Sequence, residues 1–143
     1  MSKSKIPVSV FMIKNIATIS PLNTVEDAAK IFYEKNITSL MVMQNNELVG
    51  LVTEKDLVTS VLVFDNNKDT QIKDIMTSSI VSVNSDISVI NAANLMIEKN
   101  IHKLPVMEDG KLVGLISATD LIVVFSMSNE DDLVKIFGTQ LGL

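Results

Sequence analysis

The chain has 143 residues, 47% hydrophobic and 20% charged, a balance typical of one globular domain or two very small ones. It has no cysteine, which excludes disulfides and thiolate-bound metals, and no apolar run approaches the ~18 residues that a membrane span needs. A net charge of −5 and the absence of arginine and tryptophan disfavour nucleic acid as a partner. The N-terminal residues lack a signal-peptide pattern, so we expect a cytoplasmic protein without a membrane partner. The single histidine leaves little room for general-base catalysis or a metal site.

The chain repeats itself at a spacing of 64 residues. Residues 12–58 align without a gap on residues 76–122, and 18 of the 47 pairs are identical, whereas average composition would give about three. This duplication predicts two small units that share one core. The expected parts are repeat 1 at residues 8–64, a polar linker at 65–74, repeat 2 at 75–127 and a C-terminal tail at 128–143.

The first half of each unit reads as a strand followed by a helix. In repeat 1 an alternating stretch, Ile16–Ile19, ends at Pro21. Thr24 and Asp27 then have the spacing of a capping box, and apolar residues at helical spacing run to Asn36, a typical C-terminal stop.

The second half reads as a hairpin followed by a second helix. Two apolar strands, Leu40–Met43 and Leu48–Val52, flank a two-residue turn, and a helix runs from Thr53 to about Phe64. Repeat 2 follows the same β-α-β-β-α order up to about Met127. The predicted fold is therefore mixed α/β (α+β), two tandem β-α-β-β-α repeats, and residues 129–138 of the tail predict a short last helix.

A Gly-x-x-Ser/Thr-x-x-Asp motif lies where the last strand of each unit meets its last helix. It occurs as Gly50, Thr53 and Asp56, and again as Gly114, Ser117 and Asp120. One interpretation is a capping box that only starts a helix. The other is a ligand site, in which free amides at the helix N-terminus and the hydroxyl receive a phosphate and the aspartate accepts from a ribose diol. Both interpretations stay open at this point.

A basic loop distinguishes the two units. His102 and Lys103 precede the second strand of repeat 2, where repeat 1 has Thr38 and Ser39. The two cations are either a solvated pair or groups that face a phosphate. The eight methionines are interpreted as core side chains rather than metal ligands.

Together these features resemble the CBS-domain pair, also called a Bateman module, over about residues 8–127. The resemblance rests on four features: the opening Met12 with the Ile16–Pro21 strand, the Ala28-Ala29 helix, the Ile101–Val106 segment, and the two Gly-x-x-Ser/Thr-x-x-Asp motifs. It implies a pseudo-twofold module with two clefts between the repeats, each able to hold AMP, ADP, ATP or S-adenosylmethionine.

The resemblance also assigns roles to residues. It implies that Asp56 and Asp120 bind ribose, and that the hydroxyls before them bind phosphate or ribose. It places the basic loop near the ligand of Asp56, and the neutral loop of repeat 1 near that of Asp120. The candidate ligand-binding residues are Thr18, Thr38, Ser39, Thr53, Lys55, Asp56, Ser82, His102, Lys103, Pro105, Ser117, Thr119 and Asp120.

The function expected from this resemblance is a stand-alone ligand-sensing module. It would report occupancy by an adenosine derivative to an unidentified regulated protein or through its own assembly. No catalytic residue, metal or obligatory cofactor is expected, so an enzyme acting on nucleotides is disfavoured. The alternative is a structural dimerisation module without nucleotide. The helices from about Thr53 and Ser117 are apolar on more than one face, which predicts a homodimer.

Overall fold

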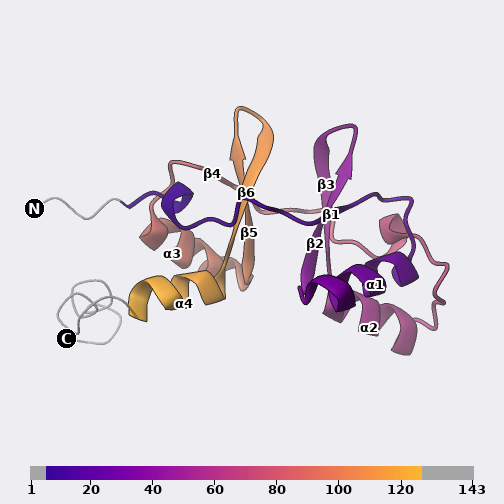
Figure 1. Cartoon of the computed structure of the whole chain (residues 1–143). Helices are drawn as coiled ribbons and strands as arrows, with labels where there is room; N and C mark the ends of the chain where they lie inside the picture. Colours follow the sequence, from indigo (N-terminus) through magenta and orange to yellow (C-terminus); the bar gives the residue numbers. More distant parts are fainter. Residues whose placement is uncertain (1–5, 127–143) are drawn as a thin grey trace, which may run out of the picture. The chain divides into compact units, whose positions relative to one another are not determined.

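The computed structural model describes residues 6–126, so the predicted tail helix lies outside the described residues. The chain forms two compact units. The repeat-1 unit is Asn15–Val81, and the repeat-2 unit combines Met1–Lys14 with Ser82–Leu143. Figure 1 shows the elements of both units in sequence colours. Among the described helices, none is long and apolar enough to cross a membrane.

The repeat-1 unit is a three-stranded sheet with two helices and one 3₁₀ turn. Its strand order is β1-β2-β3, with β1 parallel and β3 antiparallel to β2. The elements in chain order are β1 (Thr18–Ile19), α1 (Val25–Lys35), β2 (Ser39–Gln44), β3 (Glu47–Thr53), α2 (Glu54–Leu62) and η2 (Ile72–Asp74).

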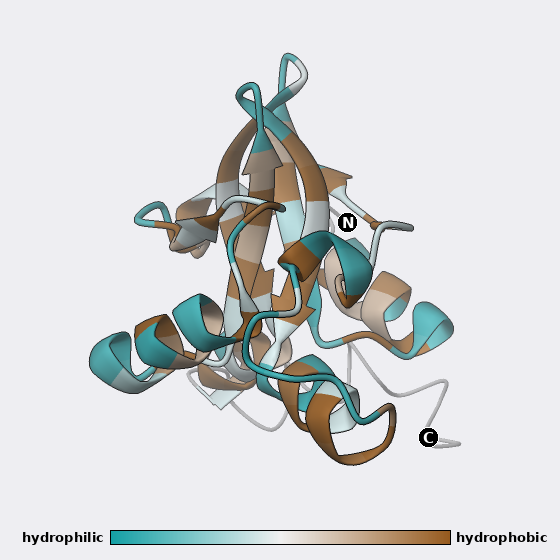
Figure 2. Cartoon of the chain, turned by 90° about the vertical axis from the view of Figure 1, so that its right-hand side faces the viewer, coloured by the Kyte–Doolittle hydropathy of each residue, from teal (hydrophilic) through white to brown (hydrophobic). Residues whose placement is uncertain are grey.

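The repeat-2 unit has the same topology, with strand order β4-β5-β6. Its elements are η1 (Val8–Val10), β4 (Val83–Asn84), α3 (Val89–Lys99), β5 (Lys103–Glu108), β6 (Lys111–Ser117) and α4 (Ala118–Ser126). The strands of both units are largely hydrophobic, and the hairpin loops that join them are hydrophilic (Figure 2). The predicted α+β fold of two β-α-β-β-α repeats is confirmed.

Local sequence signals define the ends of these elements. The Thr24 hydroxyl accepts from the Asp27 amide (3.2 Å) and the Asp27 carboxylate accepts from the Thr24 amide (2.9 Å), so the predicted capping box starts α1. Asn36 ends α1 in the left-handed conformation, with φ of 52°. In the first hairpin Asn45 and Asn46 both have positive φ, as a tight two-residue turn requires.

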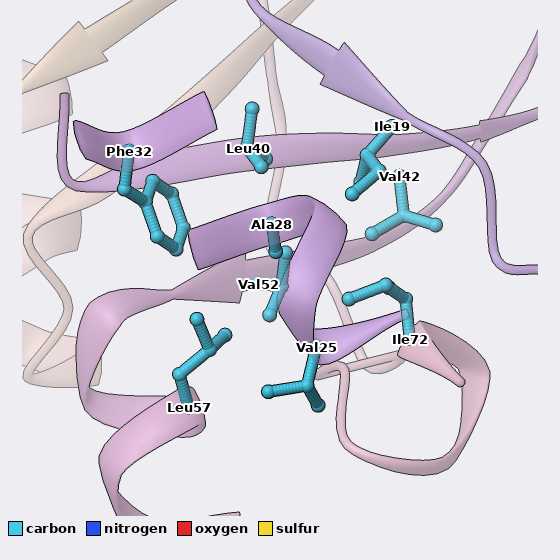
Figure 3. Packing of buried hydrophobic residues seen from close by; sticks show 9 residues of the cluster. All are labelled: Ile19, Val25, Ala28, Phe32, Leu40, Val42, Val52, Leu57 and Ile72. Atoms are coloured by element: carbon cyan, nitrogen blue, oxygen red, sulfur yellow. The ribbon is translucent and has the colours of Figure 1, made fainter. Parts of the chain in front are cut away.

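Nine buried side chains form the core of the repeat-1 unit (Figure 3): Ile19, Val25, Ala28, Phe32, Leu40, Val42, Val52, Leu57 and Ile72. Their equivalents at the 64-residue spacing are also buried in the repeat-2 unit: Val83, Val89, Ala92, Met96, Leu104, Val106, Ile116, Leu121 and, for Ile72, Val8. Ile and Val exchange places at three of these pairs, so the summed volume changes little. The one larger replacement is Phe32 by Met96, an adaptable side chain.

Ile72 and Val8 belong to two segments that pack alike in different units. We call residues 6–14 the N-terminal crossing segment and residues 70–78 the middle crossing segment. The Val8 amide donates to Ile87 O (2.9 Å) and the Ile72 amide donates to Asn23 O (2.8 Å), which are equivalent positions. The segment that precedes repeat 1 in the chain is thus part of the repeat-2 unit, and the segment after the polar loop completes the repeat-1 unit.

Each crossing segment also lies against the glycine of one motif. Met76 packs on Gly50, and a Cβ on that glycine would lie 3.0 Å from Met76 Cγ. Met12 packs on Gly114, where a Cβ would lie 2.8 Å from Met12 Cγ. A side chain at either glycine would displace the methionine, so glycine permits this close approach. Next to these contacts, Thr77 pairs with Leu51 and Ile13 with Leu115 through reciprocal backbone hydrogen bonds.

Candidate functional site

The strand-to-helix corner of the repeat-1 unit is formed by Thr53 and Asp56. Thr53 is the last residue of β3 and the N-cap of α2. The Asp56 Oδ2 atom accepts from the Thr53 amide (2.8 Å) and from the Thr53 hydroxyl (3.0 Å), and the Asp56 amide donates to Thr53 Oγ1 (3.3 Å). The motif therefore does form a capping box in this repeat.

The equivalent corner of the repeat-2 unit is formed by Ser117 and Asp120. Asp120 Oδ2 accepts from the Ser117 amide (2.9 Å), and the Asp120 amide donates to Ser117 Oγ (3.1 Å). Ser117 is buried, and its hydroxyl donates no bond to Asp120 as the Thr53 hydroxyl does to Asp56. The Thr53 hydroxyl proton is thus committed to its own aspartate, whereas that of Ser117 is not.

Capping engages only one oxygen of each aspartate. Within the described chain, Oδ1 of Asp56 and Oδ1 of Asp120 make no protein hydrogen bond, and both residues are half-buried. Each carboxylate can therefore cap its helix through Oδ2 and accept from a ligand through Oδ1. The capping and ligand-binding interpretations are compatible for the same side chain.

The helix N-terminus offers a ligand fewer amides than the sequence predicts. The Glu54 amide donates to the Thr38 carbonyl oxygen (3.1 Å), and the Asp56 amide is held by Thr53. In the repeat-2 unit the Ala118 amide donates to the His102 carbonyl oxygen (2.9 Å). Two of the first three amides of each helix are thus occupied, one by the loop before the hairpin and one by the N-cap side chain.

Strand register brings the other candidates to the same corners. Ser39 lies opposite Thr53 on the neighbouring strand, and Lys103 lies opposite Ser117. Lys55 and Thr119 are exposed in the first turns of α2 and α4. Each unit therefore gathers one aspartate, one hydroxyl residue and the first residue of its second strand at the end of its hairpin.

The first strands carry the remaining candidates, Thr18 and Ser82. Thr18 pairs with Met41, whose amide donates to the Ala17 carbonyl oxygen (3.1 Å). Pro105 occupies the position of Met41 in repeat 2 and has no amide to donate. The ladder consequently begins one residue later, at Val83 and Val106, and Ser82 lies just before β4.

The basic loop lies beside the aspartate of its own repeat. His102 and Lys103 are in the repeat-2 unit with Asp120, and Thr38 and Ser39 are in the repeat-1 unit with Asp56. The cross-assignment implied by the family resemblance, in which Lys103 serves the ligand of Asp56, stays a prediction.

Sequence reasoning missed Met12 and Met76 as supports of the corners. Each contacts the motif glycine three residues before the hydroxyl residue. The signal was present, because these methionines are an identical pair at the 64-residue spacing and both motif glycines are as well.

The resolved pKa shifts lie away from the corners, at the start of α1. The backbone hydrogen bond from Thr24, followed by the side-chain bond from Asn23, lowers the pKa of Asp27. The hydrogen bond and charge of Lys30 lower the pKa of Glu26, with Lys68 contributing, and Glu26 in turn raises the pKa of Lys30. Repeat 2 has Ile90, Asn91 and Asn94 at the equivalent positions, so this charge network is specific to repeat 1.

Comparison with known proteins identifies the family. The family model of the CBS domain matches residues 8–63 and 72–126, and the chain therefore belongs to the CBS domain family, as a CBS-domain pair. The CBS domain-containing protein YhcV of Bacillus subtilis is 30% identical over 119 residues, which are 83% of this chain and 84% of that protein.

Two similar solved structures contain adenosine derivatives. The CBS domain pair of protein MJ0100, in complex with 5′-methylthioadenosine and S-adenosyl-L-methionine, is 26% identical with a TM-score of 0.77 and covers 85% of this chain and 96% of that one. CBSX2 in complex with AMP is 29% identical with a TM-score of 0.72 and covers 82% and 94%. Among the described residues, no group of three potential metal-binding side chains occurs.

Proposed function

We propose that this chain is a regulatory module that binds an adenosine derivative at each of its two strand-to-helix corners. The ligand class is AMP, ADP, ATP or S-adenosylmethionine, and binding is not followed by catalysis. The solved relatives with AMP and with S-adenosyl-L-methionine support this class.

One observation carries the proposal: both corners keep the same carboxylate oxygen unengaged. Oδ1 of Asp56 and Oδ1 of Asp120 each lie next to a hydroxyl residue, in the two repeats alike. A ribose diol supplies two hydroxyl donors, which suits a carboxylate acceptor that is half removed from water. A duplication that retained only the capping box would not need aspartate in both copies, since glutamate or glutamine at this third helical position also accepts from the N-cap amide.

The chemistry of the two loops favours different ligands. Lys103, aided by His102, can neutralise phosphate, whereas Thr38 and Ser39 can only donate neutral hydrogen bonds. We propose that the site served by Lys103 prefers the more highly phosphorylated ligands. The family resemblance assigns that service to the ligand of Asp56.

Titration calorimetry with AMP, ADP, ATP and S-adenosylmethionine tests the proposal. We expect two sites per chain for at least one ligand, and one remaining site in Asp56→Ala and in Asp120→Ala. A thermal shift should accompany binding, because a ligand at 100 times its Kd adds about 2.7 kcal/mol to stability. If the double variant binds as well as the wild type, the two corners are not the sites.

A second candidate is a purely structural pair without nucleotide. The capping boxes favour it, because both are complete within the protein. In that case none of the four ligands should shift the unfolding temperature, while Asp56→Ala and Asp120→Ala should still lower it through loss of the caps.

We also propose that the chain forms a homodimer through the last helix of each repeat, α2 and α4. Val58 on α2 and Ile122 on α4 occupy equivalent positions, and 56% and 66% of their surfaces are exposed. Leu62, Val63 and Phe64 at the end of α2 are exposed as well. Exposed apolar surface at the same place in both repeats would match itself across a twofold axis, so the occupant that we favour is a second copy.

Light scattering tests the dimer. We expect about twice the chain mass of 15.7 kDa for the wild type, and a shift to one chain when Val58 and Ile122 are both replaced by Asp. Tyr33→Asp, at an exposed site on α1, is the matched control and should leave the mass unchanged. A single-chain mass for the wild type would contradict the dimer.

The proposed function also includes a regulated protein partner, which would respond to ligand occupancy. We further propose that the protein is located in the cytoplasm.

A further inference from the structure

The two crossing segments link the two proposed sites through short stretches of chain. The middle crossing segment is anchored in the repeat-1 unit, where Ile72 is buried and Thr77 is paired with Leu51. Five residues after Thr77 the chain reaches Ser82, a candidate site residue of the repeat-2 unit. The N-terminal crossing segment makes the reverse connection, from Ile13 to Thr18.

Each crossing segment is anchored on the strand that ends at the corner of its unit, through a pair of backbone hydrogen bonds. Leu51 precedes Thr53 by two residues on β3, and its amide and carbonyl both bond Thr77 (2.9 Å each). Leu115 precedes Ser117 by two residues on β6 and bonds Ile13 in the same way (2.9 and 2.8 Å). Next to these bonds, Met76 contacts Gly50 and Met12 contacts Gly114.

Each anchor is followed by only a short stretch of chain before the other unit begins. Close-packed interiors transmit small displacements, so a shift at the end of β3 must move Thr77 and the segment attached to it. Five residues reach about 17 Å at full extension, which makes the connection to Ser82 a short tether. A second connection has the opposite direction. It starts at Ile13, which is paired with Leu115 in the repeat-2 unit, and ends at Thr18 in the repeat-1 unit.

We propose that the two ligand sites are coupled, so that occupation of one corner changes the affinity of the other through the crossing segments. This inference rests on the proposed binding function and concerns its regulation. Coupling between binding sites is reciprocal and typically changes affinity by about 5- to 150-fold. Loosening the tethers should remove the coupling.

Glycine insertions test the coupling with the full chain. Two glycines are inserted between Asn15 and Ile16 and two between Ser79 and Ile80, which are equivalent positions in the tethers. The control protein carries the same insertions in the hairpin turns, between Asn45 and Asn46 and between Asp109 and Gly110. Calorimetry uses whichever of AMP, ATP and S-adenosylmethionine binds the wild type.

In the wild type, one site is filled while the other is already occupied. We expect the affinity of that step to differ at least fivefold from the affinity of the same site in Asp56→Ala or Asp120→Ala, where the other site is absent. The factor is taken within each protein as the ratio of these two affinities. The tether insertions should bring it to about one, and the hairpin insertions should preserve it. Independent sites in the wild type, or coupling that survives the tether insertions, would overturn the proposal.

A second measurement needs no ligand and separates this proposal from the binding function. Met76→Ala should accelerate amide exchange at residues 80–84, because it loosens the anchor on Gly50. Met43→Ala, a partly buried methionine on β2 of the same unit, is the control and should not do so. Failure of all three ligands to bind would refute the proposed function alone, whereas equal exchange at residues 80–84 in the two variants would refute transmission along the segment.

Discussion

The two repeats share one scaffold and differ most where a ligand would contact them. Eighteen of 47 aligned positions are identical, and the nine-residue core is reproduced position by position. At the corner, by contrast, repeat 1 has Thr38, Ser39 and Met41 where repeat 2 has His102, Lys103 and Pro105. The backbone bond that joins loop to helix is nevertheless the same in both, at 3.1 and 2.9 Å.

This contrast separates the residues that make the fold from those that tune the site. The loop carbonyl at position 38 or 102 bonds the helix amide whatever its side chain, so the scaffold tolerates either a neutral or a cationic loop. Differences that the scaffold does not require are the ones to assign to ligand preference. Replacement of Met41 by Pro105 also shows how one missing amide moves the start of a strand by one residue.

The largest expected effect concerns which unit each crossing segment stabilises. Val8→Ala and Ile72→Ala remove equivalent, fully buried side chains, and each should cost about 2–4 kcal/mol. Val8→Ala should destabilise the repeat-2 unit although Val8 precedes repeat 1 in the chain. Amide exchange should accelerate in α3 for Val8→Ala and in α1 for Ile72→Ala. Faster exchange in α1 for Val8→Ala would show that the N-terminal crossing segment supports the other unit in solution.

The next effect distinguishes capping from ligand binding at the corners. Asp56→Asn and Asp120→Asn keep an oxygen for the cap but remove the carboxylate, so ligand affinity should fall by about 1–3 kcal/mol while stability changes little. Asp27→Asn is the matched control, a capping-box aspartate of α1 that has no proposed ligand. Unchanged affinity in Asp56→Asn and Asp120→Asn would assign both aspartates to capping alone.

A smaller effect follows from exchange of the loop residue between repeats. Lys103→Ser should weaken ATP by roughly 1 kcal/mol or less and leave adenosine almost unchanged, because a partly exposed cation is screened by water. The reciprocal Ser39→Lys should raise the affinity of one site for ATP. Combining Lys103→Ser with Asp56→Ala or with Asp120→Ala identifies the ligand that Lys103 contacts. In the double variant that already lacks this ligand's aspartate, Lys103→Ser should cause no further loss of ATP affinity. Equal weakening of adenosine and ATP would remove the phosphate role of Lys103.

Most of the fold was predictable because its signals are local and occur twice. Thr24 with Asp27, Asn36 and the hairpin turns each fix a helix or strand end within a few residues. The repeat spacing then confirmed every element against its copy. The motif position of Asp56 and Asp120 was predictable for the same reason.

What the sequence did not predict depends on contacts between distant segments. Nothing local to Val8 indicates that it packs beside Ile87 rather than within repeat 1, because alternation and helical spacing describe a segment and not its partner. The prediction of several free amides at the helix N-termini was wrong for the same reason, since the carbonyl oxygens of Thr38 and His102 accept from the first helix amide out of a distant loop. Extension of the alignment from Met12 and Met76 back to Val8 and Ile72 carries a weak signal for the crossing segments.

The smallest expected effect is a difference in acid sensitivity between α1 and α3. Hydrogen bonds from Thr24 and Asn23 lower the pKa of Asp27 below its ordinary value of 3.8. Asp27 therefore stabilises the folded state at pH values above the pKa that this carboxyl has in the unfolded chain. This contribution is lost as the pH falls through the pKa of the folded state. Asn91 occupies the equivalent position in α3 and cannot titrate, although its amide also bonds the cap residue, Ser88 (3.1 Å).

Amide exchange in the first turn of α1 and of α3, followed between pH 5 and pH 2 and corrected for the intrinsic rate, measures this difference. Protection of the first-turn amides of α1 should decline on acidification, whereas that of α3 should not, because only the α1 cap contains a titrating carboxylate. Asp27→Asn should flatten the decline in α1, and Asn91→Asp should introduce one in α3, because the added carboxylate can accept from the Ser88 amide as Asp27 does from Thr24. An acid response of α1 that persists in Asp27→Asn would instead point to Glu26, whose pKa is also lowered, chiefly by Lys30.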